Sequence, residues 1–213
     1  MSNPVLWTST NTSGSIAHQA AMVSGLSIDL RFISLRGGDT KKPDYLAINP
    51  KGEVPALQLP DGTVITEIPA VIFWLAEAAP ESGLLPSGPS GRAKGMEWLA
   101  WCHWTMGRHF NPAFGPLRFA GGHEGAAEAV RAAALLRAKD ALAFAEAAVK
   151  QGGGTLCGTE QPTGADIFLA ALTTFAGFLR IDIADLPALL ALAEQVAAMP
   201  GVAAAKAREA AQG

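Results

Sequence analysis

The sequence predicts an α/β domain followed by an all-helical domain. Over the first part of the chain, short apolar segments that suit strands alternate with helical patterns, ending at "IPAVIFWLAEAAP". A Pro/Gly/Ser-rich stretch, "SGLLPSGPSGR", comes next, and apolar residues then recur at helical spacing along the rest of the chain. We therefore expect an α/β domain at residues 1–81, a linker at 82–92 and a helical-bundle domain at 93–213.

A strand, a helix and a second strand open the chain. The run "PVLW" suits a short strand, and "TSTNTSGS" suits a loop that caps the next helix. The helix "IAHQAAMVSGL" should end at Gly25, because glycine adopts the left-handed conformation that stops a helix. "IDLRFISL" then alternates as a strand does, so the two strands should be parallel with a right-handed crossover.

A hairpin and a helix complete the first domain. "VPALQL" and "VITE" are strand candidates separated by "PDG", in which each residue favours a chain reversal. The helix that follows accommodates Pro69 in its first turn and stops at Pro80. Pro55 needs an explanation, because proline cannot donate a hydrogen bond within a sheet; taken alone it indicates an edge strand.

Helical spacing dominates the second domain. It is clear in "AKGMEWLAWCHWTMGRHF" and in "AAEAVRAAALLRAKDALAFAEAAVKQ". Further on, Thr163 precedes Asp166 by three residues at the start of an apolar helix, the pattern of a reciprocal capping box. We expect Asp166 to be structural, with a loss that exceeds the ~1 kcal/mol of a surface cap because its surroundings are dry.

Composition excludes several classes of partner. The net charge is −3 and the 16 Lys and Arg residues are scattered, so we expect neither nucleic acid nor an anionic membrane surface as a partner. Cys102 and Cys157 lie far apart with no zinc-type histidine spacing, which predicts reduced thiols and no metal. The start "MSNPVLWTS" lacks the features of a signal peptide and no apolar run is long enough for a membrane span, so we expect a cytoplasmic protein.

The element order β-α-β-α-β-β-α, with a proline at the start of the third strand, resembles the thioredoxin-like fold. Within it, "NPKGEVPAL", the following "TE" and the next helix resemble the N-terminal domain of cytosolic glutathione transferases, most closely the bacterial beta class. The resemblance implies a cis bond between Val54 and Pro55. It also implies that the backbone of Val54 pairs with the cysteinyl part of glutathione, as a short added strand would.

Glu67 and Ile68 stand where the chain enters a helix. A helix N-terminus presents unpaired N–H groups and partial positive charge, so it suits an anionic ligand. By resemblance, Glu67 contacts the ammonium group of the γ-glutamyl end of glutathione. Ile68 replaces the serine or glycine of the family and offers only its backbone N–H. From the residues alone, Glu67 also fits a first-turn acid that complements the helix dipole.

The loop "TSTNTSGS" occupies the place where the family carries the residue that activates the glutathione thiol. Such a thiol has a pKa of about 8.5, and lowering it by about 2 units requires about 2.7 kcal/mol of preferential thiolate stabilisation. By register with the beta class, Ser13 is the activating residue, with Thr12, Asn11 and Thr10 as alternatives one to three residues away. The residues themselves also fit a plain helix cap.

The resemblance further implies an apolar electrophile pocket on the first long helix of the second domain. We expect four side chains to contribute: Trp104, Arg108, Phe110 and Phe114. At positions where the beta class has further ligand contacts, this chain has small residues: Gly38, Ala100 and Gly107.

Together these features predict a homodimeric glutathione transferase of the kind used in detoxification. It would bind glutathione as co-substrate in the first domain, activate its thiol and transfer it to an apolar electrophile, without a metal. Two alternatives stay open. One is a non-catalytic protein that binds glutathione or carries ligands; the other is a glutathione-dependent peroxide or disulfide reductase. Without a cysteine near Ser13, the reductase would have to work through glutathione alone.

Overall fold

The computed structural model describes residues 2–212 and divides into two compact units. The first comprises the chain up to Leu85 together with the segment from Ala197 on, and the second comprises Pro86–Val196. The expected domains, 1–81 and 93–213, therefore differ from the observed units mainly at the C-terminus, where the last helix packs within the first unit. The connection between the units is also shorter than the predicted linker at 82–92, because a helix already begins at Gly88.

The first unit contains the predicted thioredoxin-like sheet. Its four strands are β1 (Val5–Thr8), β2 (Asp29–Phe32), β3 (Ala56–Gln58) and β4 (Val64–Thr66), in the spatial order β2-β1-β3-β4. β1 is parallel to β2, as the crossover predicted, and β3 is antiparallel to both β1 and β4. Leu6 and Leu57 face each other across β1 and β3 and are fully buried, which anchors the centre of the sheet.

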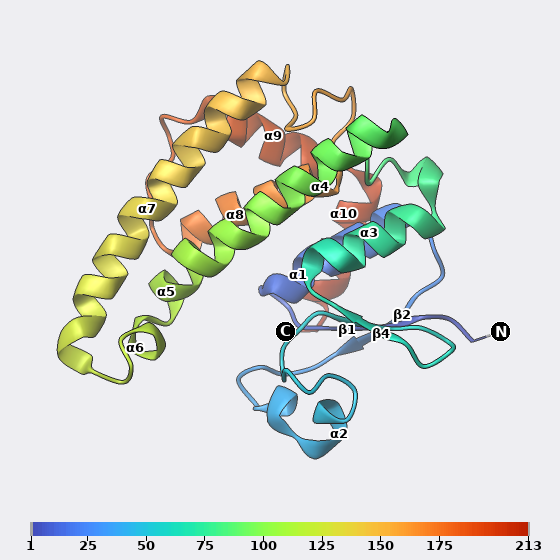
Figure 1. Cartoon of the computed structure of the whole chain (residues 1–213), viewed down its shortest axis with the longest axis horizontal. Helices are drawn as coiled ribbons and strands as arrows, with labels where there is room; N and C mark the ends of the chain where they lie inside the picture. The colour runs from blue at the N-terminus through green and yellow to red at the C-terminus, as the bar shows by residue number, and fades with distance from the viewer. Residues whose placement is uncertain (1, 213) are drawn as a thin grey trace. The chain divides into compact units, whose positions relative to one another are not determined.

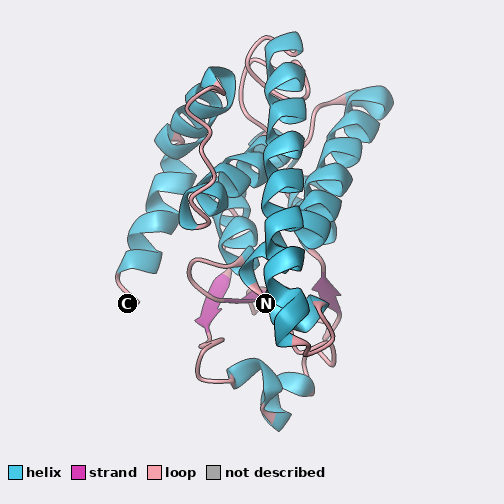
Figure 2. Cartoon of the chain, turned by 90° about the vertical axis from the view of Figure 1, so that its left-hand side faces the viewer, coloured by secondary structure: helices cyan, strands magenta, loops and turns pink. Residues whose placement is uncertain are grey.

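The helices of this unit lie on both faces of the sheet. They are α1 (Ser13–Ser24), α2 (Pro43–Leu46), α3 (Ile68–Ala78) and α10 (Pro200–Ala210), with short 3₁₀ turns η1 (Asp39–Lys41) and η2 (Pro80–Ser82). α1, α3 and α10 lie on one face and α2 on the other (Figures 1 and 2). Gly201 lets α10 approach α1 closely, since an added Cβ would lie 2.7 Å from the backbone nitrogen of Val23.

Glu209 joins α10 to α1. One oxygen of its carboxylate accepts a hydrogen bond from the Ser15 hydroxyl at 2.7 Å, and the other lies 2.8 Å from Nδ1 of His18. His18 is fully buried, and the Glu209 side chain is only 11% exposed. A buried acid with two polar partners holds a helix firmly, so α10 fixes the N-terminal half of α1.

The second unit is helical. Its elements are α4 (Gly88–Thr105), the π-helical turn η3 (Met106–Phe110), α5 (Asn111–Phe114), α6 (Pro116–Phe119), α7 (Glu124–Gln151), α8 (Gly164–Phe178) and α9 (Pro187–Ala198). α8 is buried without interruption from Gly164 to Thr173 and packs on α4. A helix that is apolar all round in this way belongs in the centre of its unit.

The start of α8 forms the predicted capping box. Asp166 Oδ2 accepts hydrogen bonds from the backbone N–H and the hydroxyl of Thr163, at 2.7 and 2.8 Å. Its other oxygen accepts from the N–H of Leu156 at 2.8 Å. Burial raises the pKa of Asp166, although these hydrogen bonds oppose the effect. The carboxylate therefore joins the helix start to the preceding loop inside the unit.

The two cysteines are unpaired, and the pKa of each thiol is raised. Cys102 is fully buried, and burial raises the pKa of its thiol well above the ordinary value. Burial likewise raises the pKa of Cys157 to about 11. Neither forms a thiolate readily near neutral pH, so protein-centred thiol chemistry has no support at these positions.

Of the described helices, no single one has both the length and the apolar composition of a membrane span. Only α9 and α10 taken as a pair, bent by 79° at their junction, meet both criteria together. Within residues 2–212, no group of three or more His, Cys, Asp and Glu side chains is arranged to hold a metal ion.

Candidate functional site

The N-terminus of α1 brings two of the predicted site residues together. Thr12 is the N-cap: its hydroxyl oxygen accepts a hydrogen bond from the N–H of Gly14 at 3.0 Å and its proton goes to Ser9 O at 2.8 Å. Ser13 is the first residue of the helix. Its half-buried hydroxyl donates to the backbone oxygen of Val54 at 2.8 Å, across 41 residues of sequence.

The four hydroxyl and amide candidates of this loop differ in what their side chains do. Thr12 is occupied as the helix cap. Asn11 is exposed with a positive φ of 56°, and no hydrogen bond is recorded for the side chain of Thr10 within the described chain. Of the four, Ser13 alone reaches the segment before Pro55. The geometry therefore favours Ser13 over its neighbours.

Two side-chain hydrogen bonds fix the backbone just before Pro55. The Val54–Pro55 bond is cis, as the resemblance implied, and both residues are buried. The carbonyl oxygen of Glu53 accepts from the Tyr45 hydroxyl at 2.6 Å and from the Asn49 side chain at 2.7 Å. Sequence reasoning missed these supports, because Tyr45 lies on the short helix before the motif "NPKGEVPAL" and the spacing within the motif does not identify its first residue, Asn49, as a donor.

Glu67 stands at the N-cap of α3 with a backbone conformation that non-glycine residues rarely adopt, φ 69° and ψ 129°. Such outliers cluster at ligand sites. Its side chain is 45% exposed and pairs with Lys51, whose Nζ lies 2.6 Å from Oε1 and also donates to the Thr66 hydroxyl at 2.8 Å. The side chain of Ile68 is buried, so only its backbone faces the helix start.

Lys51 was not predicted as a site residue. It lies inside "NPKGEVPAL", three positions before Val54, and a closer reading of that motif would have found it as a charge beside Glu67. An ammonium group already sits on the Glu67 carboxylate, which shows that this carboxylate is placed to receive a cation.

The starts of α1 and α3 are both suited to anions. Neither helix has an acidic residue of its own in its first turn. The two carboxylates near these helix starts, Glu209 and Glu67, already have cationic or hydrogen-bonding partners. The first N–H groups of each helix therefore still present partial positive charge. At the start of α1 the Ser13 hydroxyl adds a hydrogen-bond donor, and at the start of α3 the Glu67 carboxylate adds a group that binds a cation. This arrangement suits a ligand with an anionic sulfur, a carboxylate and an ammonium group.

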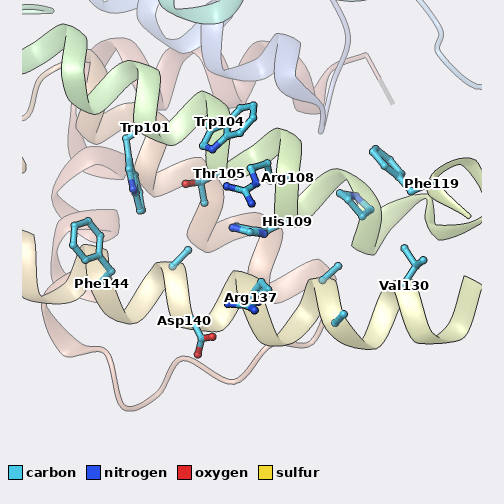
Figure 3. A pocket seen from close by; sticks show the side chains of 14 residues that line it. Trp101, Trp104, Thr105, Arg108, His109, Phe119, Val130, Arg137, Asp140 and Phe144 are labelled. Atoms are coloured by element: carbon cyan, nitrogen blue, oxygen red, sulfur yellow. The ribbon is translucent and has the colours of Figure 1, made fainter.

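A second feature lies entirely within the helical unit. A cavity of about 850 Å³ opens between α4 and η3 on one side and α7 on the other (Figure 3). Trp104 and Arg108 line it, with the Arg108 guanidinium 5.0 Å from the centre of the Trp104 ring. Phe110 and Phe114 do not line this cavity: Phe110 is fully buried in the core, and Phe114 packs edge-on against Phe175.

Basic groups gather in this cavity. Arg108 and His109 come from η3 and Arg137 from α7, whereas Asp140 is the one acidic residue of the lining. The pKa of His109 is lowered, first by burial and then by repulsion from Arg108 and Arg137. The lowered pKa favours the neutral form of His109, so the positive charge of the lining comes from the two guanidinium groups, opposed by the carboxylate of Asp140.

Comparison with known proteins identifies the family of this chain. The family model described as "Glutathione S-transferase, N-terminal domain" matches residues 16–78. The Escherichia coli O157:H7 protein named glutathione S-transferase GstA is 31% identical over 178 residues, which cover 83% of this chain and 82% of that protein. The chain belongs to the glutathione S-transferase family.

Other relatives extend the comparison. A Rhizobium meliloti protein named maleylacetoacetate isomerase is 30% identical to this transferase over 154 residues, 71% of each chain. The solved glutathione S-transferase of Xylella fastidiosa has a TM-score of 0.84 at 28% identity and covers 98% of this chain and 99% of its own. A sphingomonad glutathione S-transferase, solved in complex with glutathione, has a TM-score of 0.83 at 28% identity, covering 97% and 98%.

Proposed function

We propose that this transferase binds glutathione in its first unit and uses the Ser13 hydroxyl to stabilise the thiolate, which then attacks an apolar electrophile. The observation that carries the proposal is the hydrogen bond of 2.8 Å from Ser13 to Val54 O. It puts the candidate activating group directly beside the backbone that, by family resemblance, receives the cysteinyl part of glutathione. The solved relative that holds glutathione supports the choice of ligand.

The Ser13 hydroxyl can exchange its hydrogen bond to Val54 O for one to the sulfur of the ligand. Without ligand its proton goes to Val54 O. When the cysteinyl N–H of glutathione takes that oxygen, the hydroxyl is released to donate to the sulfur of the same cysteinyl residue. A hydrogen bond to a charged group contributes about 1.5–3 kcal/mol, and the start of α1 adds to it. Together they match the roughly 2.7 kcal/mol that a 2-unit drop of the thiol pKa requires.

The second helix start holds the other end of the ligand. Glu67 receives the γ-glutamyl ammonium group, in part replacing Lys51, and the N–H of Ile68 receives the γ-glutamyl carboxylate. Lys51 moves from Glu67 toward that carboxylate, so no charge is left unpaired. Binding at both ends leaves the thiol free for chemistry, which explains why activation and affinity should separate in mutants.

Titration of the bound thiol tests this function. Thiolate absorbance of the glutathione complex should give a pKa well below the solution value, and Ser13→Ala should raise it by about 1–2 units with little change in affinity. If Thr12→Val or Asn11→Ala shifts the titration and Ser13→Ala does not, the activating residue is misassigned. An unshifted thiol in the wild-type complex would favour a non-catalytic glutathione carrier.

Isomerisation is a second candidate, because of the relative named maleylacetoacetate isomerase. The same bound thiolate would add to a double bond and leave again after rotation, so that glutathione is not consumed. Separation of the cis and trans isomers of maleylacetoacetate after incubation tests it. A hydroperoxide assay with the same preparation tests the remaining alternative, glutathione-dependent reduction.

We also propose a cytoplasmic homodimer. A large apolar side chain of α7 outside the cavity, Leu136, is 64% exposed in the single chain, and charged residues make up only 16% of the sequence. Exposed apolar surface of this kind commonly mediates association. Light scattering at micromolar concentration should give twice the mass of the chain; a monomeric mass would contradict the proposal.

A further inference from the structure

We infer that the cavity of the helical unit selects an electrophile that carries a carboxylate beside a flat apolar body. The inference rests on the proposed transfer of glutathione and names the chemical class of its acceptor. In this reading Arg108 and Arg137 bind the carboxylate and the aromatic wall binds the body.

The two guanidinium groups face one cavity from opposite walls. Arg108 belongs to η3 and Arg137 to α7, and both line the cavity. Figure 3 shows Arg108 and His109 extending from η3 toward α7, with the carboxylate of Asp140 turned away from them. Within residues 2–212 neither guanidinium has a recorded hydrogen bond or ion pair; Arg108 instead stacks on Trp104. Two unneutralised guanidinium forks suit one carboxylate, which arginine binds through paired hydrogen bonds.

The backbone conformation of η3 supports a role of this turn in ligand binding. Arg108 and His109 both lie on the π-helical turn between α4 and α5. π-helical turns are rare and occur frequently at functional sites. The turn therefore adds an observation that is independent of charge.

Aromatic rings provide the second half of the site. Trp101 and Phe144 lie 5.5 Å apart between ring centres on facing walls, and Trp104 is 62% exposed. A planar apolar group that enters here covers rings that otherwise face solvent. Ligand sites typically combine such apolar walls with a few charged groups that fix orientation.

The test reaction is a nucleophilic aromatic substitution. With an aryl chloride, the glutathione thiolate forms a carbon–sulfur bond at the ring carbon, and chloride leaves with the electron pair of the broken bond. The thiol proton has already passed to solvent. Neither oxidant nor metal takes part, so a change of rate reports on binding and thiolate activation.

A matched pair of substrates isolates the carboxylate. We would compare 4-chloro-3-nitrobenzoate with 4-chloro-3-nitrobenzamide, and divide each kcat/KM by the uncatalysed rate with free glutathione. Wild-type enzyme should prefer the benzoate by about tenfold after this correction. The preference should fall as salt rises, since exposed charges are screened.

Variants then assign the preference. Arg137→Gln and Arg108→Gln should each bring the ratio of benzoate to benzamide close to one. Arg131→Gln is the control, because it removes the same charge from α7 at an exposed position outside the cavity lining, and the ratio should stay as in wild type. Asp140→Asn should raise the ratio slightly, because it removes the one acid of the lining.

Binding without chemistry separates this inference from the proposed function. Unreactive 3-nitrobenzoate should quench the fluorescence of Trp101 and Trp104 more strongly than 3-nitrobenzamide at equal concentration. Conjugation of both chlorides at equal corrected rates would overturn the carboxylate selectivity and leave the transferase function standing. Absence of any conjugation, with arginine-dependent quenching by nitrobenzoate intact, would instead overturn the transfer itself and with it the carboxylate as part of an acceptor.

Discussion

The starts of α1 and α8 have similar residues but differ in where the acid that stabilises them comes from. Each opens with a threonine N-cap, Thr12 or Thr163. At α8 the third helical residue is Asp166, which closes the cap locally and is fully buried with Thr163. At α1 the third helical residue is Ser15, and the acid comes instead from Glu209 on the last helix. The start of α8 is thus capped by an acid of the same helix, whereas the acid that binds the start of α1 comes from α10.

This difference leaves the first residue of α1 available. Ser13 is not needed for capping, and its hydroxyl reaches Val54 O instead. At α8 the corresponding residue, Gly164, is buried. A helix start that is held by a distant acid can offer its own hydroxyl and dipole to a ligand, which is what stabilisation of a thiolate requires.

Removal of the local acid should have the largest effect. Asp166→Ala leaves the buried N–H groups of Leu156 and Thr163 without a partner, so we expect a loss of about 3–4 kcal/mol in the free energy of unfolding. Urea denaturation with an unchanged slope measures it. Thr163→Ser keeps the hydroxyl and should cost far less. A loss below about 1 kcal/mol would mean that the cap is no stronger than one on the surface.

Removal of the distant acid should come second. Glu209→Gln keeps the shape and weakens the contacts with Ser15 and His18, so we expect a loss of about 2 kcal/mol. Because α1 then loses its outside support, the pKa of the bound glutathione thiol should also rise. Glu194→Gln, at an exposed position on α9, is the control. A loss of stability with no change in the thiol pKa would show that Glu209 supports the fold but not the position of Ser13.

The sequence predicted whatever is encoded by neighbouring residues. The capping box of Thr163 and Asp166, the stop at Gly25 and the parallel pairing of the first two strands all follow from local patterns, and the structure has each of them. Glu209 was missed because its partners lie almost two hundred residues earlier, 191 and 194 positions away. No local spacing reveals such a pair.

The cavity of the helical unit illustrates the same limit. Trp104 and Arg108, which were expected to contribute to an electrophile pocket, both line this cavity, but the facing residue Arg137 lies on another helix. The family resemblance also implied that Phe110 contributes to this pocket. In the structure the π-helical turn ends at Phe110, and its side chain points into the core. A departure from regular α-helix cannot be read from apolar spacing.

Glu67 extends the comparison to a third helix start, that of α3. Its ion pair with Lys51 is half-exposed and should contribute little to stability. Glu67→Ala should therefore weaken glutathione binding by about tenfold, roughly 1.4 kcal/mol, because the ligand ammonium loses its acceptor. Calorimetric titration measures the affinity, and the thermal midpoint without ligand should hardly move. Unchanged affinity would leave Glu67 as a partner of the helix dipole alone.

The smallest effect should come from Glu146, which holds the start of α9 from α7. Its carboxylate accepts from the N–H groups of Ala188 and Leu189 at 3.1 and 2.8 Å. Burial opposes its ionisation, but hydrogen bonds from Lys150 and these N–H groups prevail, so the pKa of Glu146 lies below its ordinary value.

A lowered pKa in the folded state fixes the sign of the pH dependence. The carboxylate contributes its full stability above the ordinary glutamate pKa of about 4.3, and the contribution is lost as the pH falls through the lower, folded value. Glu146→Gln should therefore be about 1 kcal/mol less stable than wild type at pH 7, and the two should converge in acid. Urea titrations at a series of pH values measure the gap. A gap that persists undiminished at the lowest pH at which the protein still folds would show that the charge of Glu146 is not what holds α9, and would separate this helix start from the other two that depend on an acid.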